Sequence, residues 1–246
     1  MAPAAVEFNH VTKSLGGRRV LDDVSFRIDA GQRVCILGRS GTGKSVTLKH
    51  VIGLMTADSG QVLVEGGDVG RLGRRELTQL RQRIGFLFQN SALFDSINVG
   101  ENVEFPMRRH TRRSSREIRE RAERLLADVG LEQDYDTMPA NLSGGMRKRA
   151  ALARALALEP AILLADEPSA GLDPVTAGEI DRLLMGLDRA RTTMLVVTHN
   201  IPSARAIGDE LIFLHEGRIL ARGAPAQLAA SEIPLVRDFM SSEGSG

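Results

Sequence analysis

The sequence has few of the features that mark disulfide-bonded, nucleic-acid-binding or membrane-spanning chains. It contains a single cysteine, Cys35, so no disulfide can form within one chain. The formal net charge of +1 is not the basic excess expected of a nucleic-acid-binding protein, so no nucleic-acid partner is expected. Residues 1–9 have no basic start and no apolar stretch, so no signal peptide is expected. No stretch reaches the roughly 18 apolar residues that span a bilayer, so any membrane path must come from another chain.

The composition that remains is typical of one globular α/β domain. With 246 residues, 42% of them hydrophobic, the chain can bury a full core. Cys35 falls in an apolar run and is expected to be a core thiol. The sequence shows no internal repeat, which predicts one copy of the domain in the chain.

Residues 38–45 match the phosphate-loop pattern G-x-x-x-x-G-K-[ST] at every position. The glycines let backbone N–H groups point at an anion, and the helix expected over 46–52 adds its positive end. A turn that binds nothing is disfavoured, because the apolar run 34–37 before the loop completes a strand–loop–helix context. Lys44 is expected to reach the β- and γ-phosphates and Ser45 to ligate Mg²⁺. The predicted nucleotide contacts here are Gly38, Arg39, Ser40, Gly41, Thr42, Gly43, Lys44 and Ser45.

A second anion-binding helix start is predicted at Leu142-Ser143-Gly144-Gly145-Met146. Ser143 and the two glycines would open a helix over residues 147–158, which is rich in Ala, Leu and Arg. Taken alone, the motif would be read as an ordinary helix cap. The segment that follows it favours a ligand.

That segment is an apolar run ending in two carboxylates, Asp166 and Glu167, bounded by Pro160 and Pro168. A run of this length fits a buried parallel strand, and open α/β sheets bind ligands at the carboxyl ends of their strands. Asp166 suits a Mg²⁺ partner, usually through water, and Glu167 suits a base that polarises an attacking water. An acidic cap after a strand, without catalytic function, is the alternative.

Together and in this order, the motifs resemble those of the ATPase subunits of ABC transporters. The resemblance covers about Val6 to about Gly223 and includes three further residues: Gln89 in Phe86-Leu87-Phe88-Gln89, Asp173 in Ser169-Ala170-Gly171-Leu172-Asp173, and His199 after the apolar run 193–198. It implies an α/β P-loop NTPase fold, with a RecA-like parallel core, an antiparallel β subdomain and an inserted α-helical signature subdomain.

The resemblance also implies a homodimer whose two ATP sites form only when the subunits stack head to tail. Ser143, Gly144 and Gly145 would contact the nucleotide held by Lys44 of the other copy. Gln89 would contact Mg²⁺ together with Ser45 and Asp166, and would report its state to a transmembrane partner. Glu167, Lys44 and His199 would act in hydrolysis, His199 by holding the γ-phosphate and water, while Asp173 would link the two sites.

A finer resemblance is to the ATPases of Mla-type phospholipid transporters, whose partners carry MCE domains. It rests on residues 90–110, on Met146 in place of the commoner Gln, and on residues 151–160. It implies an integral-membrane permease, an MCE-domain protein bound through it, in many complexes a small STAS-domain protein, and a peripheral place at the cytoplasmic face of the bacterial inner membrane. Some of Leu93, Phe94, Val99 and Phe105 are expected in the subdomain core, while residues 91–97 line a groove for the permease's coupling helix.

One position departs from the family pattern. Leu15 stands where ABC ATPases usually place an aromatic residue that stacks on adenine. Base–aromatic stacking contributes about 1–3 kcal/mol, and leucine supplies only part of this through apolar contact. We therefore expect a weaker adenine contact and poorer discrimination between ATP and GTP.

The sequence predicts a single ATPase domain over residues 1–240. Its core and β lobe are expected at about 1–89 and 160–224, and its helical subdomain at about 90–159. Residues 225–246 are expected to form a C-terminal helix followed by a tail that is mobile from residue 241 on. An edge strand over 6–11 and strands over 20–28 and 61–65 would form the antiparallel sheet. The other expected elements are helices over 74–83, over 114–129 and from Asp173 on, and a hairpin over 211–221 that turns at Glu216-Gly217.

A cluster of arginines before and within the first turns of the helix expected over 114–129 suggests a lipid-headgroup or RNA site, but a solvated helix face is favoured. Its members, Arg108, Arg109, Arg112, Arg113, Arg116 and Arg119, would pair with Glu117, Glu120 and Glu123.

Two alternatives to phospholipid transport stay open. The first is an importer ATPase for another small-molecule cargo, because cargo contacts and the direction of transport belong to other chains. The second is an ABC ATPase acting on ribosomes or DNA without transport. It is disfavoured because the chain has neither a second ATPase half nor a long coiled-coil insertion.

Overall fold

The computed structural model describes residues 3–242, and the chain divides into two compact units. The first unit comprises Met1–Arg81 and Asp188–Gly246, and the second comprises Gln82–Leu187. The lobes expected from the sequence, with a helical part at about 90–159, stay a prediction. Among the helices of residues 3–242, none combines the length and the apolar composition needed to span a bilayer.

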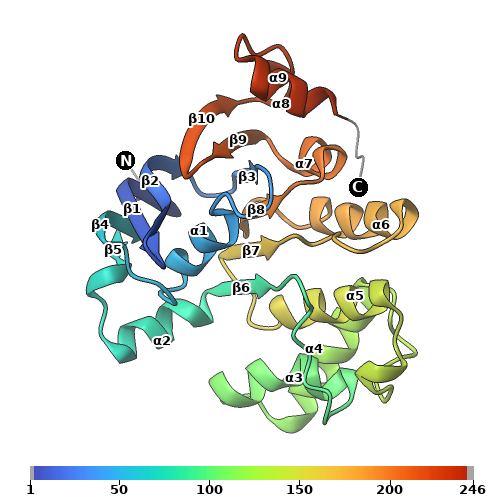
Figure 1. Cartoon of the computed structure of the whole chain (residues 1–246). Coiled ribbons are helices and arrows are strands. Elements are labelled where there is room, and N and C mark those ends of the chain that lie inside the picture. Colours follow the sequence, from blue (N-terminus) through green and yellow to red (C-terminus); the bar gives the residue numbers. More distant parts are fainter. Residues whose placement is uncertain (1–2, 243–246) are drawn as a thin grey trace. The chain divides into compact units, whose positions relative to one another are not determined.

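An antiparallel sheet in the first unit has the strand order β2-β1-β4-β5 (Figure 1). Its strands are β1 (Val6–Leu15), β2 (Arg18–Ile28), β4 (Ser59–Val64) and β5 (Gly67–Asp68). The prediction of this sheet is confirmed, but β1 is not an edge strand, because it pairs with β2 on one side and β4 on the other. Alternating burial shows that one face of a strand is covered, and it does not show how many neighbours the backbone has.

The described part of the first unit also contains β3 (Arg33–Leu37), β8 (Thr193–Thr198), β9 (Glu210–His215) and β10 (Arg218–Gly223), of which β3, β8 and β9 run parallel. Strand β3 runs parallel to both β8 and β9, and every residue of β3 and β8 is buried. Such continuous apolar runs are typical of parallel strands covered on both faces. Cys35 is buried within β3, as expected. The predicted hairpin is the antiparallel pair β9–β10, which turns at Glu216 and Gly217 with positive φ.

The helices of this part of the chain are α1 (Lys44–Val51), η1 (Val69–Arg71), α2 (Arg74–Gln82), α7 (Ile201–Ile207), α8 (Pro225–Ala229) and α9 (Pro234–Ser241). Where one C-terminal helix was predicted, two short helices form, because Pro234 begins a new helix after the break at 230–233. The Phe239 ring packs on Phe213 with centroids 4.9 Å apart, which fixes α9 on β9. Ser241 still belongs to α9, and the rest of the predicted mobile tail beyond Ser242 lies outside the described residues.

The second unit contains two parallel strands and the remaining helices. The strands β6 (Ile84–Leu87) and β7 (Ile162–Asp166) pair directly. The helices are α3 (Val99–His110), α4 (Ser115–Asp128), η2 (Pro139–Asn141), α5 (Gly144–Ala155) and α6 (Pro174–Met185). Helix α5 begins three residues before its predicted start at 147, because Ser143 already caps it by accepting from Met146 N. It also ends before the predicted residue 158, and Glu159 has a positive φ ahead of Pro160.

The helix predicted over residues 114–129 is found as α4. Ser114 caps it and forms a capping box with Glu117, while Ile118, Ala122, Leu125 and Leu126 are buried.

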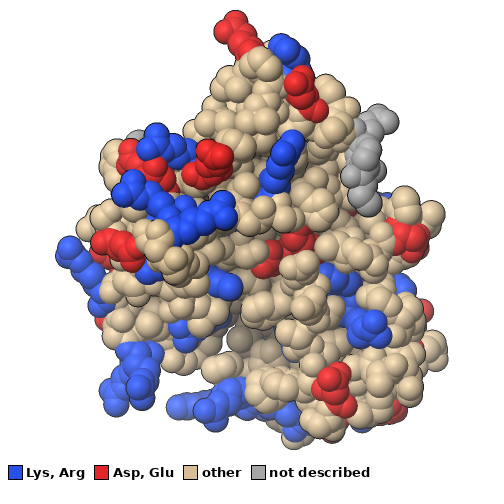
Figure 2. Space-filling model, viewed as in Figure 1, with Lys and Arg blue, Asp and Glu red and all other residues tan. Residues whose placement is uncertain are grey.

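The arginine cluster forms ion pairs along helices, as expected, though partly with other partners. Arg116 and Arg119 pair with the glutamates one turn on, Glu120 at 2.8 Å and Glu123 at 2.9 Å. Glu117 instead caps its own helix, Arg108 pairs with Glu104, and Arg113 lies 3.6 Å from Glu159. On the face shown in Figure 2, acidic and basic side chains occur close together. The ion pairs support a solvated helix surface.

Candidate nucleotide site

The predicted phosphate loop connects β3 to α1 in the first unit. Lys44 opens α1, and its side chain folds back into the loop, donating from Nζ to Gly38 O at 2.7 Å and to Arg39 O at 3.2 Å. The Thr42 hydroxyl donates to Arg39 O at 2.8 Å. These bonds curl the backbone around a buried ammonium group, an arrangement suited to a phosphate.

Gly43, the residue before α1, shows why this loop requires glycine. Its φ is 105°, in the left-handed region that other residues avoid. A Cβ atom built on it would lie 2.6 Å from Val20 O and 2.9 Å from Leu21 Cδ2. Strand β2 therefore lies directly against the loop. The same hairpin, β1–β2, carries Leu15, whose side chain is 38% exposed.

The register of β3 and β8 brings His199 to the same edge as the phosphate loop. Leu37, the last residue of β3, is paired with Thr198, the last residue of the parallel strand β8. Gly38 and His199 therefore both leave the sheet at its carboxyl edge, where α/β sheets bind ligands. His199 is exposed, and Asn200 after it caps α7 by accepting from Ser203 N.

In the second unit, parallel pairing brings together Gln89, Asp166 and Glu167. Leu87 of β6 is paired with Ala165 of β7, so Gln89 and Glu167 each stand two residues beyond paired positions. The two acidic residues are buried, with 9% of Asp166 and 8% of Glu167 exposed. Glu167 has φ 47°, a left-handed conformation that costs about 1–3 kcal/mol in a residue with a side chain. Such strain persists only where the surrounding structure holds the residue.

A residue that the sequence analysis missed contributes to that support. Lys148 of α5 donates from Nζ to the main-chain carbonyl of Gln89 and, at 3.3 Å, to that of Glu167. Burial lowers the pKa of Lys148, while the charges of Asp166 and Glu167 act in the opposite direction. The signal was present in the sequence. Lys148 lies three residues after Gly145 and four before Leu152, on the buried face of α5, where a lone cation requires partners.

The residues predicted to contact the other subunit lie at the neighbouring starts of α5 and α6. Ser143 and Gly144 are exposed, whereas Gly145 is buried against Thr176. Asp173 caps α6, accepting from Thr176 Oγ1 at 2.6 Å and from Thr176 N at 3.1 Å. These bonds, chiefly the one from the Thr176 hydroxyl, lower the pKa of Asp173. Thr176 thus connects the two helix starts.

This contact predicts a specific steric effect. A Cβ atom on Gly145 would lie 2.4 Å from Thr176 Cγ2, so Gly145→Ala should reduce the free energy of unfolding by about 1–3 kcal/mol. Adding Thr176→Ser removes that methyl group and keeps the hydroxyl bonded to Asp173, so the double variant should recover most of the loss. Urea denaturation of the single and double variants checks this. Equal stability of Gly145→Ala with and without Thr176→Ser would contradict the assigned contact.

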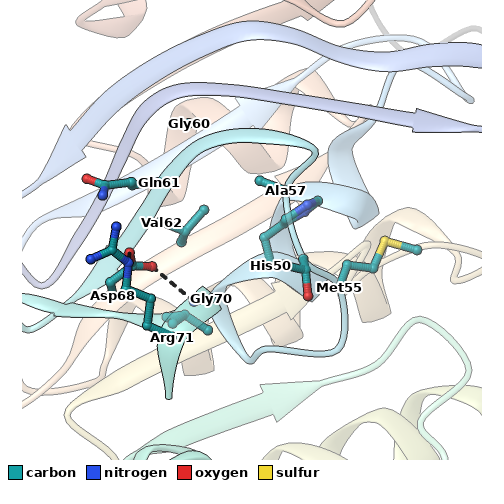
Figure 3. A pocket seen from close by; sticks show the side chains of 11 residues that line it. His50, Met55, Ala57, Gly60, Gln61, Val62, Asp68, Gly70 and Arg71 are labelled. Atoms are coloured by element: carbon teal, nitrogen blue, oxygen red, sulfur yellow. Dashed lines mark hydrogen bonds and ion pairs between the residues drawn. The ribbon is translucent and has the colours of Figure 1, made fainter. Parts of the chain in front are cut away.

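A separate pocket of about 210 Å³ in the first unit lies at the other end of α1 (Figure 3). His50, Gln61, Asp68 and Arg71 are among the residues that line it. The His50 imidazole bonds to Val46 O at 2.8 Å, and burial lowers the pKa of this histidine. None of the residues that match the nucleotide motifs is among the lining residues, so this pocket is distinct from the candidate site.

Comparison with known proteins matches the chain to a transporter family model and to transport ATP-binding proteins. The model of the family "ABC transporter" matches residues 21–170. The "Probable ribonucleotide transport ATP-binding protein mkl" of Mycobacterium tuberculosis is 42% identical over 98% of this chain and 68% of its own length. The "Intermembrane phospholipid transport system ATP-binding protein MlaF" of Escherichia coli K12 is 36% identical over 98% of this chain and 90% of its own length.

Solved structures agree with these relatives. A dimeric ATP-binding cassette, MJ0796, bound to ADP and phosphate in a post-hydrolysis state, has a TM-score of 0.83 and 36% identity, covering 89% of this chain and 98% of that one. The structure of cbiO1 from Clostridium perfringens, part of the ABC transporter complex cbiONQ, has a TM-score of 0.84 and 30% identity. The match covers 96% of this chain and 94% of cbiO1. The fold predicted from the sequence is confirmed by these similarities.

Proposed function

Because this chain belongs to the ABC transporter family as one of its ATPases, we propose that two copies hydrolyse ATP to drive phospholipid transport through a membrane permease. The similarity to MlaF, which extends over 98% of the chain, is the observation that supports this cargo. The mycobacterial relative, at 42% identity, bears a name that assigns ribonucleotides instead. A ribonucleotide importer is therefore the second candidate.

The first unit supplies the groups for nucleotide phosphate. Lys44, held inside the loop, would neutralise the β- and γ-phosphates, and the backbone N–H groups of residues 38–45 would donate to their oxygens. His199, at the same sheet edge, would hold the γ-phosphate and the attacking water. The exposed side chain of Leu15 would cover the adenine face.

The second unit supplies the groups for hydrolysis. Glu167 would orient and polarise the water for in-line attack on the γ-phosphate. Gln89 and Asp166 offer amide and carboxylate oxygens for Mg²⁺, and Ser45 of the first unit offers a hydroxyl oxygen. These are ligand types that Mg²⁺ prefers. When bound, Mg²⁺ would neutralise charge that develops on the phosphates.

The dimer interface is proposed at the starts of α5 and α6. Ser143 and Gly144 are exposed at a helix N-terminus, which favours an anion in front of it. We assign this anion as the γ-phosphate held by Lys44 of the other copy, contacted by Ser143, Gly144 and Gly145. Asp173 would connect the two sites. The bound ATP then joins the subunits, and its hydrolysis releases them.

The permease is proposed to dock on the second unit beside Gln89. Phe94 and Phe105 are 45% and 46% exposed and form an aromatic pair with centroids 4.9 Å apart. Of the four residues with an expected core role, Val99 alone is fully buried, and Leu93 is half-buried. The buried side chain of Asn102 bonds Phe94 N at 2.8 Å and Phe94 O at 3.0 Å, which holds the aromatic pair at the surface. Exposed aromatic pairs of this kind favour a protein partner.

This function places the chain peripherally at the cytoplasmic face of a bacterial inner membrane, with an MCE-domain protein bound through the permease and a small STAS-domain protein as a further partner. Affinity purification from detergent-solubilised membranes tests it. We expect a permease and an MCE-domain protein to co-purify, and ATP hydrolysis by the complex to drive transfer of labelled phospholipid. Co-purification of a nucleotide-binding receptor and no MCE-domain protein would favour the ribonucleotide candidate.

The adenine contact gives a prediction on nucleotide choice. Leu15→Tyr should increase ATP affinity by about 5- to 30-fold and increase the preference for ATP over GTP, because an aromatic ring stacks on the base. Titration with fluorescent ATP and GTP analogues measures both effects. The conservative variant Leu15→Met serves as control and should bind ATP like the wild type. Unchanged affinities in Leu15→Tyr would show that Leu15 does not contact the base.

A further inference from the structure

Lys148 joins the two chain segments that leave β6 and β7. Its ammonium group donates to the carbonyl oxygens of Gln89 and Glu167, so one side chain connects the segment after β6 with the segment after β7. Only 4% of Lys148 is exposed. Because a buried ammonium group is costly without partners, these carbonyls and the neighbouring carboxylates stabilise it at this position.

The contact with Glu167 acts on a strained residue. The backbone of Glu167 has a left-handed φ of 47°, and Lys148 holds its carbonyl oxygen rather than its carboxylate. This contact therefore acts on the backbone that carries the carboxylate. Ala170 N also donates to this oxygen, at 3.2 Å, so loss of the ammonium would remove one of two donors. The peptide after Glu167 would then be held less firmly, and the carboxylate would shift from its working position.

A second cation of the same helix holds the segment after Gln89. Arg154 donates to Ser91 O at 2.8 Å and to Ala92 O at 2.6 Å, and both residues have positive φ. Helix α5 therefore contacts residues 89–92 through two cationic side chains, Lys148 and Arg154. Since α5 starts at the cap residue Ser143, a displacement of Ser143 would reach Gln89 and Glu167 through the helix.

We propose that Lys148 is a positioning residue that sets Glu167 and Gln89 for hydrolysis and couples both to the helix that begins at Ser143. This role rests on the proposed ATPase function. It assigns Lys148 to the step of water attack and not to nucleotide binding, because its hydrogen bonds go to the main-chain carbonyls of Glu167 and Gln89.

The test compares Lys148→Met with a matched control, Arg149→Met, in the transporter complex with its permease. Arg149 also donates to two carbonyls, Val129 O at 3.2 Å and Gly130 O at 3.3 Å, but these belong to the end of α4. Both variants should lower the melting temperature by similar amounts. Lys148→Met should lower kcat by about 10- to 100-fold with KM for ATP and the ATP Kd within about twofold of wild type. Arg149→Met should leave kcat within about twofold.

The variant Lys148→Arg keeps a charged donor and should recover kcat to within about threefold of wild type. A wild-type kcat in Lys148→Met, or an equal loss of kcat in Arg149→Met, would overturn the positioning role while leaving the ATPase function intact. A rise in KM at constant kcat would also overturn it. A wild-type complex unable to hydrolyse ATP would overturn the proposed function itself, and this role with it.

Discussion

Glu167→Gln is expected to reduce ATP turnover by about 10²–10⁴-fold while ATP binding persists. The glutamine side chain has nearly the same shape but cannot polarise the attacking water. Lys148 bonds the main-chain carbonyl of Glu167, so this support survives the substitution and the fold should stay intact. Because hydrolysis would no longer release the subunits, closed dimers should accumulate with ATP. Phosphate release and size-exclusion chromatography with ATP measure the two effects.

Lys44→Ala is the matched control for Glu167→Gln. It removes the ammonium held in the phosphate loop, so it should lose affinity for ATP and form no dimer with ATP. The two variants thus separate binding from chemistry. Near-normal hydrolysis by Glu167→Gln would remove Glu167 from the role assigned to it.

Ser143→Asp is expected to reduce turnover by about 100-fold or more without loss of ATP binding by the isolated chain. Aspartate is as good a helix cap as serine, so α5 should keep its start at Gly144. The added carboxylate would face the γ-phosphate held by the other copy and repel it. The loss should therefore appear in dimer formation and hydrolysis, while the phosphate loop of the same chain binds ATP as before.

Ser143→Asn caps the helix equally well without a charge and is the control for this variant. It should retain far more activity than Ser143→Asp. Both variants are compared by fluorescent-nucleotide titration and by ATPase assay of the complex. Equal rates in Ser143→Asp and wild type would contradict an interface at this helix start.

The sequence predicts the parts of the fold that depend on local pattern. The continuous apolar runs of β3, β7 and β8 predict buried parallel strands, and all three are found. The cap residues Ser114 and Asp173 place the starts of α4 and α6, because a cap is a bond within a few residues. The phosphate loop could likewise be predicted, because its motif lies within the consecutive residues 38–45.

Features that depend on contacts distant in sequence could not be predicted. The place of β1 inside its sheet follows from pairing with β4, whose residues lie about 50 positions away. Lys148 was missed because its partners, Gln89 and Glu167, lie 59 and 19 residues away. The exposure of Phe94 and Phe105 likewise depends on how Asn102 holds the loop. A pattern shows that such a residue is unusual, and the folded chain shows its partner.

Mixed complexes test most directly whether each ATP is shared between two copies. One copy with Lys44→Ala and one with Ser143→Asp would place both defects in one site and leave the other complete, so about half of the wild-type hydrolysis is predicted. One doubly substituted copy beside a wild-type copy would leave a defect in both sites, and almost no hydrolysis is predicted. The reverse result, with hydrolysis only in the second complex, would show that each chain works alone.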